Sequence, residues 1–263
     1  MTGNHSNLPK LPLRLSPLQI LGLRDPEEGD WGRLRALQYA QLHGTSLTRL
    51  LAHALAASLT VVLFVDKAPL WLLVAWLAGL TLAVGHATRI DRSLARGDQS
   101  SMSRADYRRQ ARGVAGCALA WAFAIAAFVP FASNEELFEL WTLVVMLIAS
   151  SAVTMSAAPL ATVVFSAITG AAAIAMFVIG GNYGFGALTA AFLLIAIVGA
   201  TEIGRLCLSA RIAEAGVAEK DEVVSLLLRE FQENAGDWLW QIDTNRRVRA
   251  ASPRFAYALG RDP

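Results

Sequence analysis

Residues 140–201 read LWTLVVMLIASSAVTMSAAPLATVVFSAITGAAAIAMFVIGGNYGFGALTAAFLLIAIVGAT, and they include no Asp, Glu, Lys or Arg. A helix needs about 20 apolar residues to cross the hydrocarbon core of a bilayer, so this run has room for three crossings. Proline, glycine and asparagine provide turn chemistry at 156–159 and 180–184. The run therefore predicts three transmembrane helices joined by short turns.

Three further apolar segments precede this run, at residues 47–65, 68–88 and 113–133. The whole chain is 55% hydrophobic and 17% charged, with a mean hydropathy of +0.44, and soluble domains carry roughly 25% charged residues. We therefore predict an all-α polytopic membrane protein built on a six-helix transmembrane bundle, with the lipid bilayer as its first partner.

The distribution of arginines predicts the orientation of the bundle. Residues 89–112 carry seven Arg against three Asp, whereas the loops expected on the opposite side, near 66–67, 134–139 and 180–184, hold one Lys. Short basic loops stay in the cytoplasm. We expect a multi-pass protein of the cytoplasmic (inner) membrane with both termini in the cytoplasm.

A short amphipathic helix is predicted in the N-terminal segment, residues 1–46. Asp25 is the candidate N-cap, Pro26 takes the first helical position and Gly44 is the candidate stop. Apolar side chains then follow roughly one face, namely Trp31, Leu34, Leu37 and Leu42. The helix is expected either on the inner leaflet surface or against a neighbouring soluble domain.

Few ionisable residues fall inside the predicted spans, and such residues are functional candidates by default. His53 and His86 are expected at similar depth on adjacent antiparallel helices, where two imidazoles could ligate a haem or a metal or sense protons. The alternative is that each donates to a nearby hydroxyl or carbonyl. No third ligand is evident from the spacing, so no cofactor or metal is predicted. Cys117 and Cys207 are expected to be small apolar residues.

The middle of the bundle lacks charged residues, which argues against a solute path. Ser150 and Thr154 share a helix face, and Ser166 with Gly170 forms a small-xxx-small pair. Such residues let helices approach closely, so they are explained by packing.

Beyond Glu202 the sixth helix continues without a stop signal and becomes polar. A seven-residue repeat places apolar residues at the seam positions of a coiled coil: Ile203, Leu206, Ala210, Ala213, Val217, Val224, Leu227 and Phe231. Residues 208–235 are therefore predicted to be a helical signalling linker that forms a parallel homodimer. The alternative is a single amphipathic helix lying on its own soluble domain.

The last residues, 236–263, predict two short strands and a helix. Trp238 to Asp243 alternate apolar and polar residues, a turn follows, and a second strand begins at Val248. Ser252 is then a helix N-cap, and Gly260 a stop.

This ending resembles the start of a PAS domain, in which a first strand ends in Asp and a later helix ends in Gly. The matching residues are Asp237, Trp238, Asp243, Ser252, Phe255 and Gly260. The resemblance implies an incomplete α/β PAS start, and so a truncated reading frame or a piece of a longer protein.

The same layout is similar to the N-terminal part of bacterial signalling proteins that place diguanylate cyclase and phosphodiesterase domains after a PAS domain. The expected function is a transmembrane sensor module that relays a membrane or periplasmic stimulus to a cytoplasmic output, cyclic-di-GMP turnover. Alternatives are the input half of a sensor histidine kinase, a dimerising membrane anchor and a small-solute transporter. No enzyme motif is present, so this chain is predicted not to be an enzyme, and nothing supports nucleic-acid binding.

Overall fold

The computed structural model of the chain describes residues 16–24, 31–96, 101–234, 240–242, 248–251 and 260. The chain divides into two units, Met1–Ile212 and Ala213–Pro263, each of which is described by itself.

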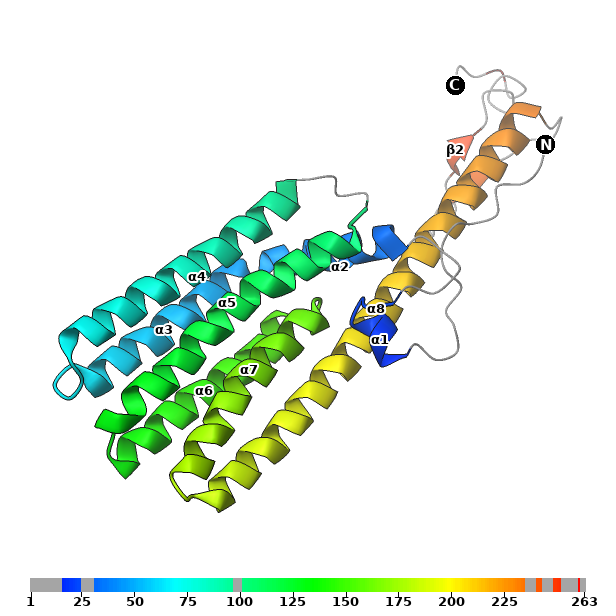
Figure 1. Ribbon diagram of the computed structural model, residues 1–263. Helices are drawn as coiled ribbons and strands as arrows, with labels where there is room; N and C mark the ends of the chain where they lie inside the picture. The colour runs from blue at the N-terminus through cyan, green and yellow to red at the C-terminus, as the bar shows by residue number, and fades with distance from the viewer. Residues whose placement is uncertain are drawn as a thin grey trace. The chain divides into compact units, whose positions relative to one another are not determined.

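Six helices of the described chain are long and apolar enough to cross a membrane, which confirms the predicted number (Figure 1). They are α3 (Ser46–Phe64), α4 (Leu70–Arg96), α5 (Arg104–Phe128), α6 (Asn134–Thr154), α7 (Pro159–Ile179) and α8 (Tyr183–Asn234). A short 3₁₀ turn, η1 (Val129–Phe131), follows α5. The chain is thus a polytopic helical membrane protein.

The charge-free run breaks at both predicted places. Pro159 opens α7, where its missing N–H is not needed, and Gly181 takes a left-handed φ of 74° just after that helix. The basic segment 89–112 differs from the loop that was predicted: α4 continues to Arg96 and α5 begins at Arg104. The Ser103 hydroxyl caps α5 by accepting from the Asp106 N–H at 3.1 Å. Charged residues at helix ends thus extend the spans.

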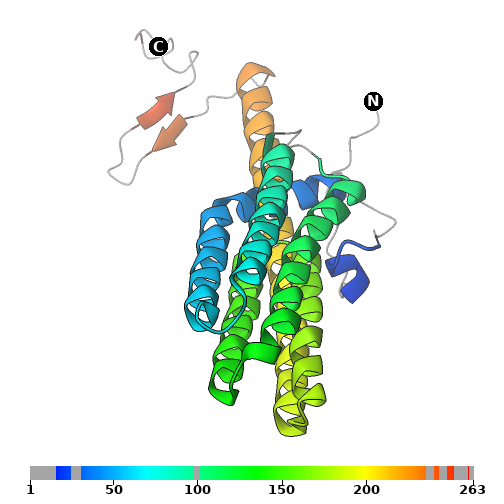
Figure 2. The ribbon, with the colours of Figure 1, turned by 60° about the vertical axis from the view of Figure 1, so that its left-hand side comes forward.

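Five of the six long helices form a closed ring. In order round the ring, α3 contacts α4, α4 contacts α5, α5 contacts α7, α7 contacts α6, and α6 contacts α3. Figure 2 shows this bundle turned by 60°. Large aromatic side chains fill the ring: Trp76 and Trp121 lie with centroids 5.4 Å apart, and Phe64 stacks on Phe128 at 5.1 Å.

The helix α8 packs on the outside of this ring. Gly170 of α7 lies so close to α8 that an added Cβ would come within 2.8 Å of Leu193. Phe185 of α8 stacks on Phe177 at 5.5 Å, and the Trp141 indole N–H of α6 donates to Thr189 Oγ1 at 3.0 Å. Gly170 therefore has the packing role that was predicted for the pair Ser166 and Gly170.

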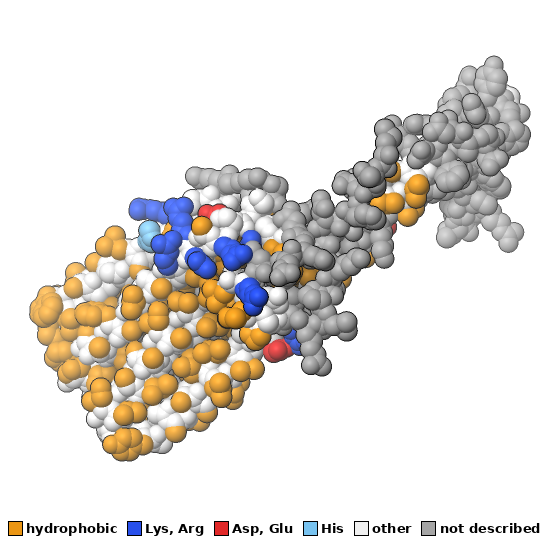
Figure 3. All heavy atoms as spheres, turned by 45° about the vertical axis from the view of Figure 1, so that its right-hand side comes forward, with side chains coloured by type: hydrophobic (Ala, Val, Ile, Leu, Met, Phe, Trp, Pro, Cys, Tyr) orange, Lys and Arg blue, Asp and Glu red, His pale blue; other side chains and the backbone are white. Residues whose placement is uncertain are grey.

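Large apolar side chains cover the outer faces of the spans (Figure 3). Val62, Leu82 and Val153 are 73%, 74% and 72% exposed, respectively. Apolar contiguous surface of this extent on a soluble monomer would cause aggregation. In a bilayer, however, it meets lipid tails, so the exposed faces agree with a membrane-embedded bundle.

The helix α2 (Trp31–Gly44) packs against the bundle, and its expected place on the inner leaflet surface remains a prediction. Tyr39 and Leu42 belong to the main core, and Trp31 forms a second buried cluster with Leu208 and Ile212 of α8. A single turn, α1 (Pro17–Ile20), precedes it, with Ile20 buried near Gly204. The position of α2 matters because it joins the two buried clusters.

In the C-terminal unit, β1 (Trp240–Ile242) and β2 (Val248–Ala251) pair antiparallel, within the two segments for which the alternation predicts strands. Gly260 has a left-handed φ of 67°, as suits a helix stop. The other residues of the PAS resemblance lie outside the described residues, namely Asp237, Trp238, Asp243, Ser252 and Phe255. The PAS start therefore remains a prediction.

The seam of the predicted coiled coil is exposed wherever its side chains are described. Leu206, Val217 and Val224 are 62%, 60% and 53% exposed, and the others follow: Ile203, Ala210, Ala213 and Leu227. The side chain of Phe231 lies outside the described residues. The coiled coil and the homodimer remain predictions.

Close packing of α8 on α7 can be tested at Gly204. A Cβ at this position would meet the ring of Pro159 at 2.9 Å, and a proline ring cannot move aside. We expect Gly204→Val to destabilise the bundle by about 1–3 kcal/mol, measured as a lower midpoint of thermal unfolding in detergent micelles. Gly199→Val is the matched control, because a Cβ there meets nothing within 4 Å. Equal losses in both variants would contradict the close approach.

Candidate functional site

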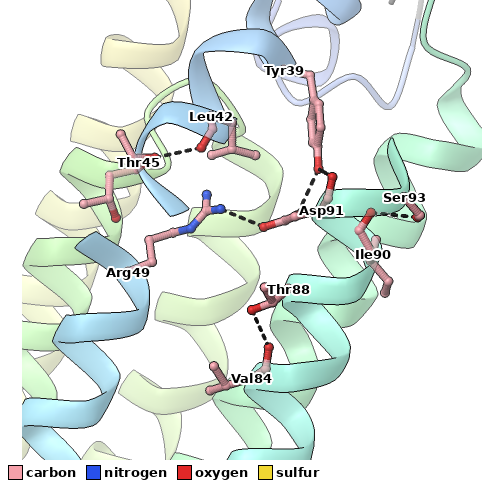
Figure 4. A network of polar contacts seen from close by, with 10 residues as sticks. Tyr39, Leu42, Thr45, Arg49, Val84, Thr88, Ile90, Asp91 and Ser93 are labelled. Atoms are coloured by element: carbon pink, nitrogen blue, oxygen red, sulfur yellow. Dashed lines mark hydrogen bonds and ion pairs between the residues drawn. The ribbon is translucent and has the colours of Figure 1, made fainter. Parts of the chain in front are cut away.

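An ion pair within the ring joins the start of α3 to the end of α4. Arg49 Nη2 lies 2.6 Å from Asp91 Oδ2, and each side chain is 13% exposed (Figure 4). Charges so far removed from water are costly unless they are paired and hydrogen-bonded. Loss of one partner of this pair is therefore expected to destabilise the bundle strongly.

Tyr39 of α2 also forms a hydrogen bond with Asp91. Its hydroxyl donates to Asp91 Oδ1 at 3.0 Å and lies 3.2 Å from the Asp91 carbonyl oxygen (Figure 4). Burial first, and then the negative charge of Asp91, raise the pKa of Tyr39 above its ordinary range. Tyr39 therefore keeps its proton and remains a hydrogen-bond donor to the carboxylate.

A second polar contact fastens the same end of the bundle to α6. The Thr45 hydroxyl, at the turn between α2 and α3, lies 2.7 Å from the carbonyl oxygen of Thr154 and 2.9 Å from that of Leu42. Thr154 is the last residue of α6, where helix carbonyls lack intrahelical partners. The network of Tyr39, Thr45, Arg49 and Asp91, here called the polar network, therefore links α2, α3, α4 and α6.

His53 lies one helical turn below Arg49, on the same face of α3. Its Nδ1 accepts from the Trp121 indole N–H at 3.1 Å, and its ring meets Phe165 edge-on at 5.8 Å. Because Nδ1 is the acceptor, the proton of the neutral ring is assigned to Nε2. His53 thus connects α3 to α5 within an aromatic setting.

A cavity of about 60 Å³ lies between the five helices of the ring, and its mainly apolar wall carries several polar groups. Its wall includes Arg49, His53 and Asp91 together with hydroxyl groups from α4 and α6: Thr88, Ser150, Ser151 and Thr154. Arg49 Nη1 is buried and makes no hydrogen bond with any described residue. A cavity of this size and polarity suits a few water molecules or a small polar ligand.

A second, more open groove lies between α3 and α4, with a volume of about 370 Å³. His53, Leu50, Val84 and Thr88 line both hollows. These four residues therefore form the partition between the cavity inside the ring and the groove on its outer side.

The sequence-predicted candidates fall in different surroundings. His53 lines both hollows, whereas His86 is exposed and lines neither. Glu202 forms an exposed ion pair with Arg205 on α8, with Arg205 Nη2 2.6 Å from Glu202 Oε2. Cys117 is buried and contributes to the cavity wall, and Cys207 is partly buried.

Sequence reasoning did not single out Arg49, Asp91 or Tyr39: Arg49 lies near the start of the first predicted span, Asp91 in the basic segment and Tyr39 in the predicted N-terminal helix. Their spacing carried a signal. Arg49 and His53 are four residues apart, and Val84, Thr88 and Asp91 share one face of α4 at helical spacing. A charged residue of each sign on facing stripes of adjacent spans predicts a pair.

Removing one member of the ion pair tests its importance. We expect Arg49→Met to destabilise the bundle by about 3 kcal/mol, because the Asp91 carboxylate is left in a poorly solvated place. The measurement is thermal unfolding in micelles. Arg205→Met, which breaks an exposed pair, should cost less than about 1 kcal/mol. The double variant Arg49→Met/Asp91→Asn should recover part of the loss, and its failure to do so would contradict a direct coupling.

The hydrogen bonds of Tyr39 are tested by Tyr39→Phe, which keeps the ring and removes only the hydroxyl. Hydrogen bonds to charged groups contribute about 1.5–3 kcal/mol, so a loss of about 2 kcal/mol is expected. Tyr183 is 69% exposed, and Tyr183→Phe should change stability by less than about 0.5 kcal/mol. Similar effects of the two substitutions would refute the role given to Tyr39.

Neither a metal-binding cluster among the described residues nor a similar known protein identifies the chemistry of this site. Across the described parts of the chain, no group of three or more His, Cys, Asp or Glu residues lies close enough to hold a metal ion. No protein-family model, curated protein or solved structure matches this chain.

Proposed function

We propose that the chain is a transmembrane signal-input module, which passes a membrane or periplasmic stimulus through α8 to a cytoplasmic output. The observation that carries this proposal is the double attachment of α2. Tyr39 holds α2 to the ion pair, and Trp31 packs on Leu208 and Ile212 of α8. A displacement of the polar network would therefore be transmitted to α8 through α2.

The length of α8 supports the same proposal. It has 52 residues, which at 1.5 Å per residue make a helix of about 78 Å, against a hydrocarbon core of about 30 Å. A single helix thus contains both an apolar span and a polar extension, and a helix transmits rotation along its axis more faithfully than a loop does. The exposed seam of this helix fits a parallel homodimer in which such a rotation changes the register.

Signalling requires two arrangements that the stimulus stabilises unequally. The polar network offers them, because the Arg49–Asp91 pair and the Tyr39 hydrogen bonds are directional contacts that either form or break. We place the output after a PAS domain and assign it to cyclic-di-GMP turnover, on the resemblance of residues 236–263; the input half of a histidine kinase is the alternative. The proposed location is the inner membrane with both termini in the cytoplasm.

A dimerising membrane anchor is the second candidate, and the exposed seam of α8 favours it equally. The two differ in whether the polar network influences α8. An anchor needs only the dimer, whereas a sensor needs the network to change the dimer.

Cysteine cross-linking in native membranes separates these functions. In a background with Cys117→Ala and Cys207→Ala, we expect Val224→Cys at the seam to cross-link several-fold faster than its neighbour Ser225→Cys. Adding Tyr39→Phe should change the rate at position 224 by roughly threefold, which corresponds to a coupling of 0.5–1 kcal/mol. Adding Trp31→Ala should abolish that change, because α2 then loses its hold on α8.

The outcomes divide as follows. If Tyr39→Phe leaves the cross-linking rate at position 224 unchanged, the result supports the anchor and contradicts the sensor. Equal rates at positions 224 and 225 remove the parallel dimer on which both functions depend.

A further inference from the structure

The groove between α3 and α4 has the dimensions and lining of a lipid site. Its volume, about 370 Å³, falls in the range of roughly 300–1,000 Å³ that is typical of ligand sites. Its walls are mainly apolar, with Leu50, Ala54 and Ala57 from α3 and Leu77 and Val84 from α4. The groove runs over about three turns of α4, from Leu77 to Thr88, or roughly 16 Å along the helix axis.

Small residues create the hollow. Ala54, Ala57 and Gly85 bring little side-chain volume to the interface between α3 and α4, and a Cβ on Gly85 would meet nothing within 4 Å. Lipid-facing helices that associate tightly use such residues to approach each other. Here α3 and α4 leave an elongated space between them. A flexible hydrocarbon chain fits a space of this shape.

Two arginines stand at one end of this groove. Arg89 and Arg92 line it, are exposed, and lie three residues apart on α4. Neither forms an ion pair or hydrogen bond within the described part of the chain. Figure 3 shows that basic side chains gather at one end of the bundle, next to the apolar surface. A guanidinium group binds two phosphate oxygens in a bidentate geometry. Arg89 and Arg92 are therefore suited to bind a phosphate group.

We propose that the groove binds an anionic phospholipid, with an acyl chain between α3 and α4 and the phosphate on Arg89 and Arg92. Basic pockets between transmembrane helices are recognised sites for anionic headgroups. No Asp or Glu lines the groove among the described residues, so the charge at its mouth is purely positive. A zwitterionic phospholipid also carries a phosphate, but the cation of its headgroup offsets that charge beside the two guanidinium groups, so a lipid with net negative charge is favoured. The proposal does not depend on the signalling function.

Native mass spectrometry of the full chain in micelles provides the test, with phosphatidylglycerol and phosphatidylcholine of the same acyl chains as probes. We expect phosphatidylglycerol to bind more tightly, and Arg89→Gln/Arg92→Gln to weaken its binding about ten- to thirtyfold, since each basic residue contributes about fivefold. Arg108→Gln/Arg109→Gln is the matched control, because these exposed arginines lie near the start of α5 and do not line the groove. The control should retain binding within about twofold.

A second pair of variants tests the acyl chain. Gly85→Leu fills the groove and should weaken binding of both lipids, whereas Gly79→Leu, also on α4 with open space at its Cβ but outside the groove, should not. Thermal unfolding of each variant confirms that it folds. Equal losses in the two arginine pairs would mean diffuse surface charge and overturn the proposal. Unchanged binding in Gly85→Leu, or full competition by glycerophosphoglycerol, which has the headgroup without chains, would overturn it as well.

Discussion

The hydrocarbon core of a bilayer offers no water to backbone N–H and C=O groups, so each spanning segment must satisfy them internally. This requirement makes every span a helix and leaves side chains to decide how the helices meet. Since lipid tails are as apolar as leucine, burial alone does not drive the association of the helices. The ring is held by close approach at small residues such as Gly113 of α5, where an added Cβ would come within 2.9 Å of Ile90 of α4, and by directional contacts such as those of Trp76 and Trp121.

Directional contacts are distributed unevenly along the bundle. At one end Lys67 pairs with Glu136, next to the helix start that Ser133 caps. At the other end the polar network joins four helices, and α2 carries the connection on to α8. Aromatic side chains pack between these ends, with Trp76 edge-on to both Trp121 and Phe128.

The number of spans and both breaks in the charge-free run were predictable, because bilayer thickness sets helix length and proline and glycine end helices locally. The pairing of Arg49 with Asp91 was not predicted, since it depends on which spans become neighbours and how each is rotated. The ring order, in which α6 and not α5 closes on α3, is a tertiary property of the same kind. His53 was recognised as a candidate from its depth, but its partner Trp121 lies 68 residues away. The groove at Gly85 depends on an absent side chain and is visible only once α3 is in place.

The hydrogen bond between Trp121 and His53 can form only when the imidazole of His53 is neutral. An indole N–H can donate and never accept, and an imidazolium carries protons on both nitrogens and has no acceptor to offer. If His53 gained a proton, two N–H groups would face each other, and Trp121 would have to turn away. The hydrogen bond between α3 and α5 therefore requires a neutral His53 ring, whereas the stack of Phe64 on Phe128 between the same two helices does not depend on that charge.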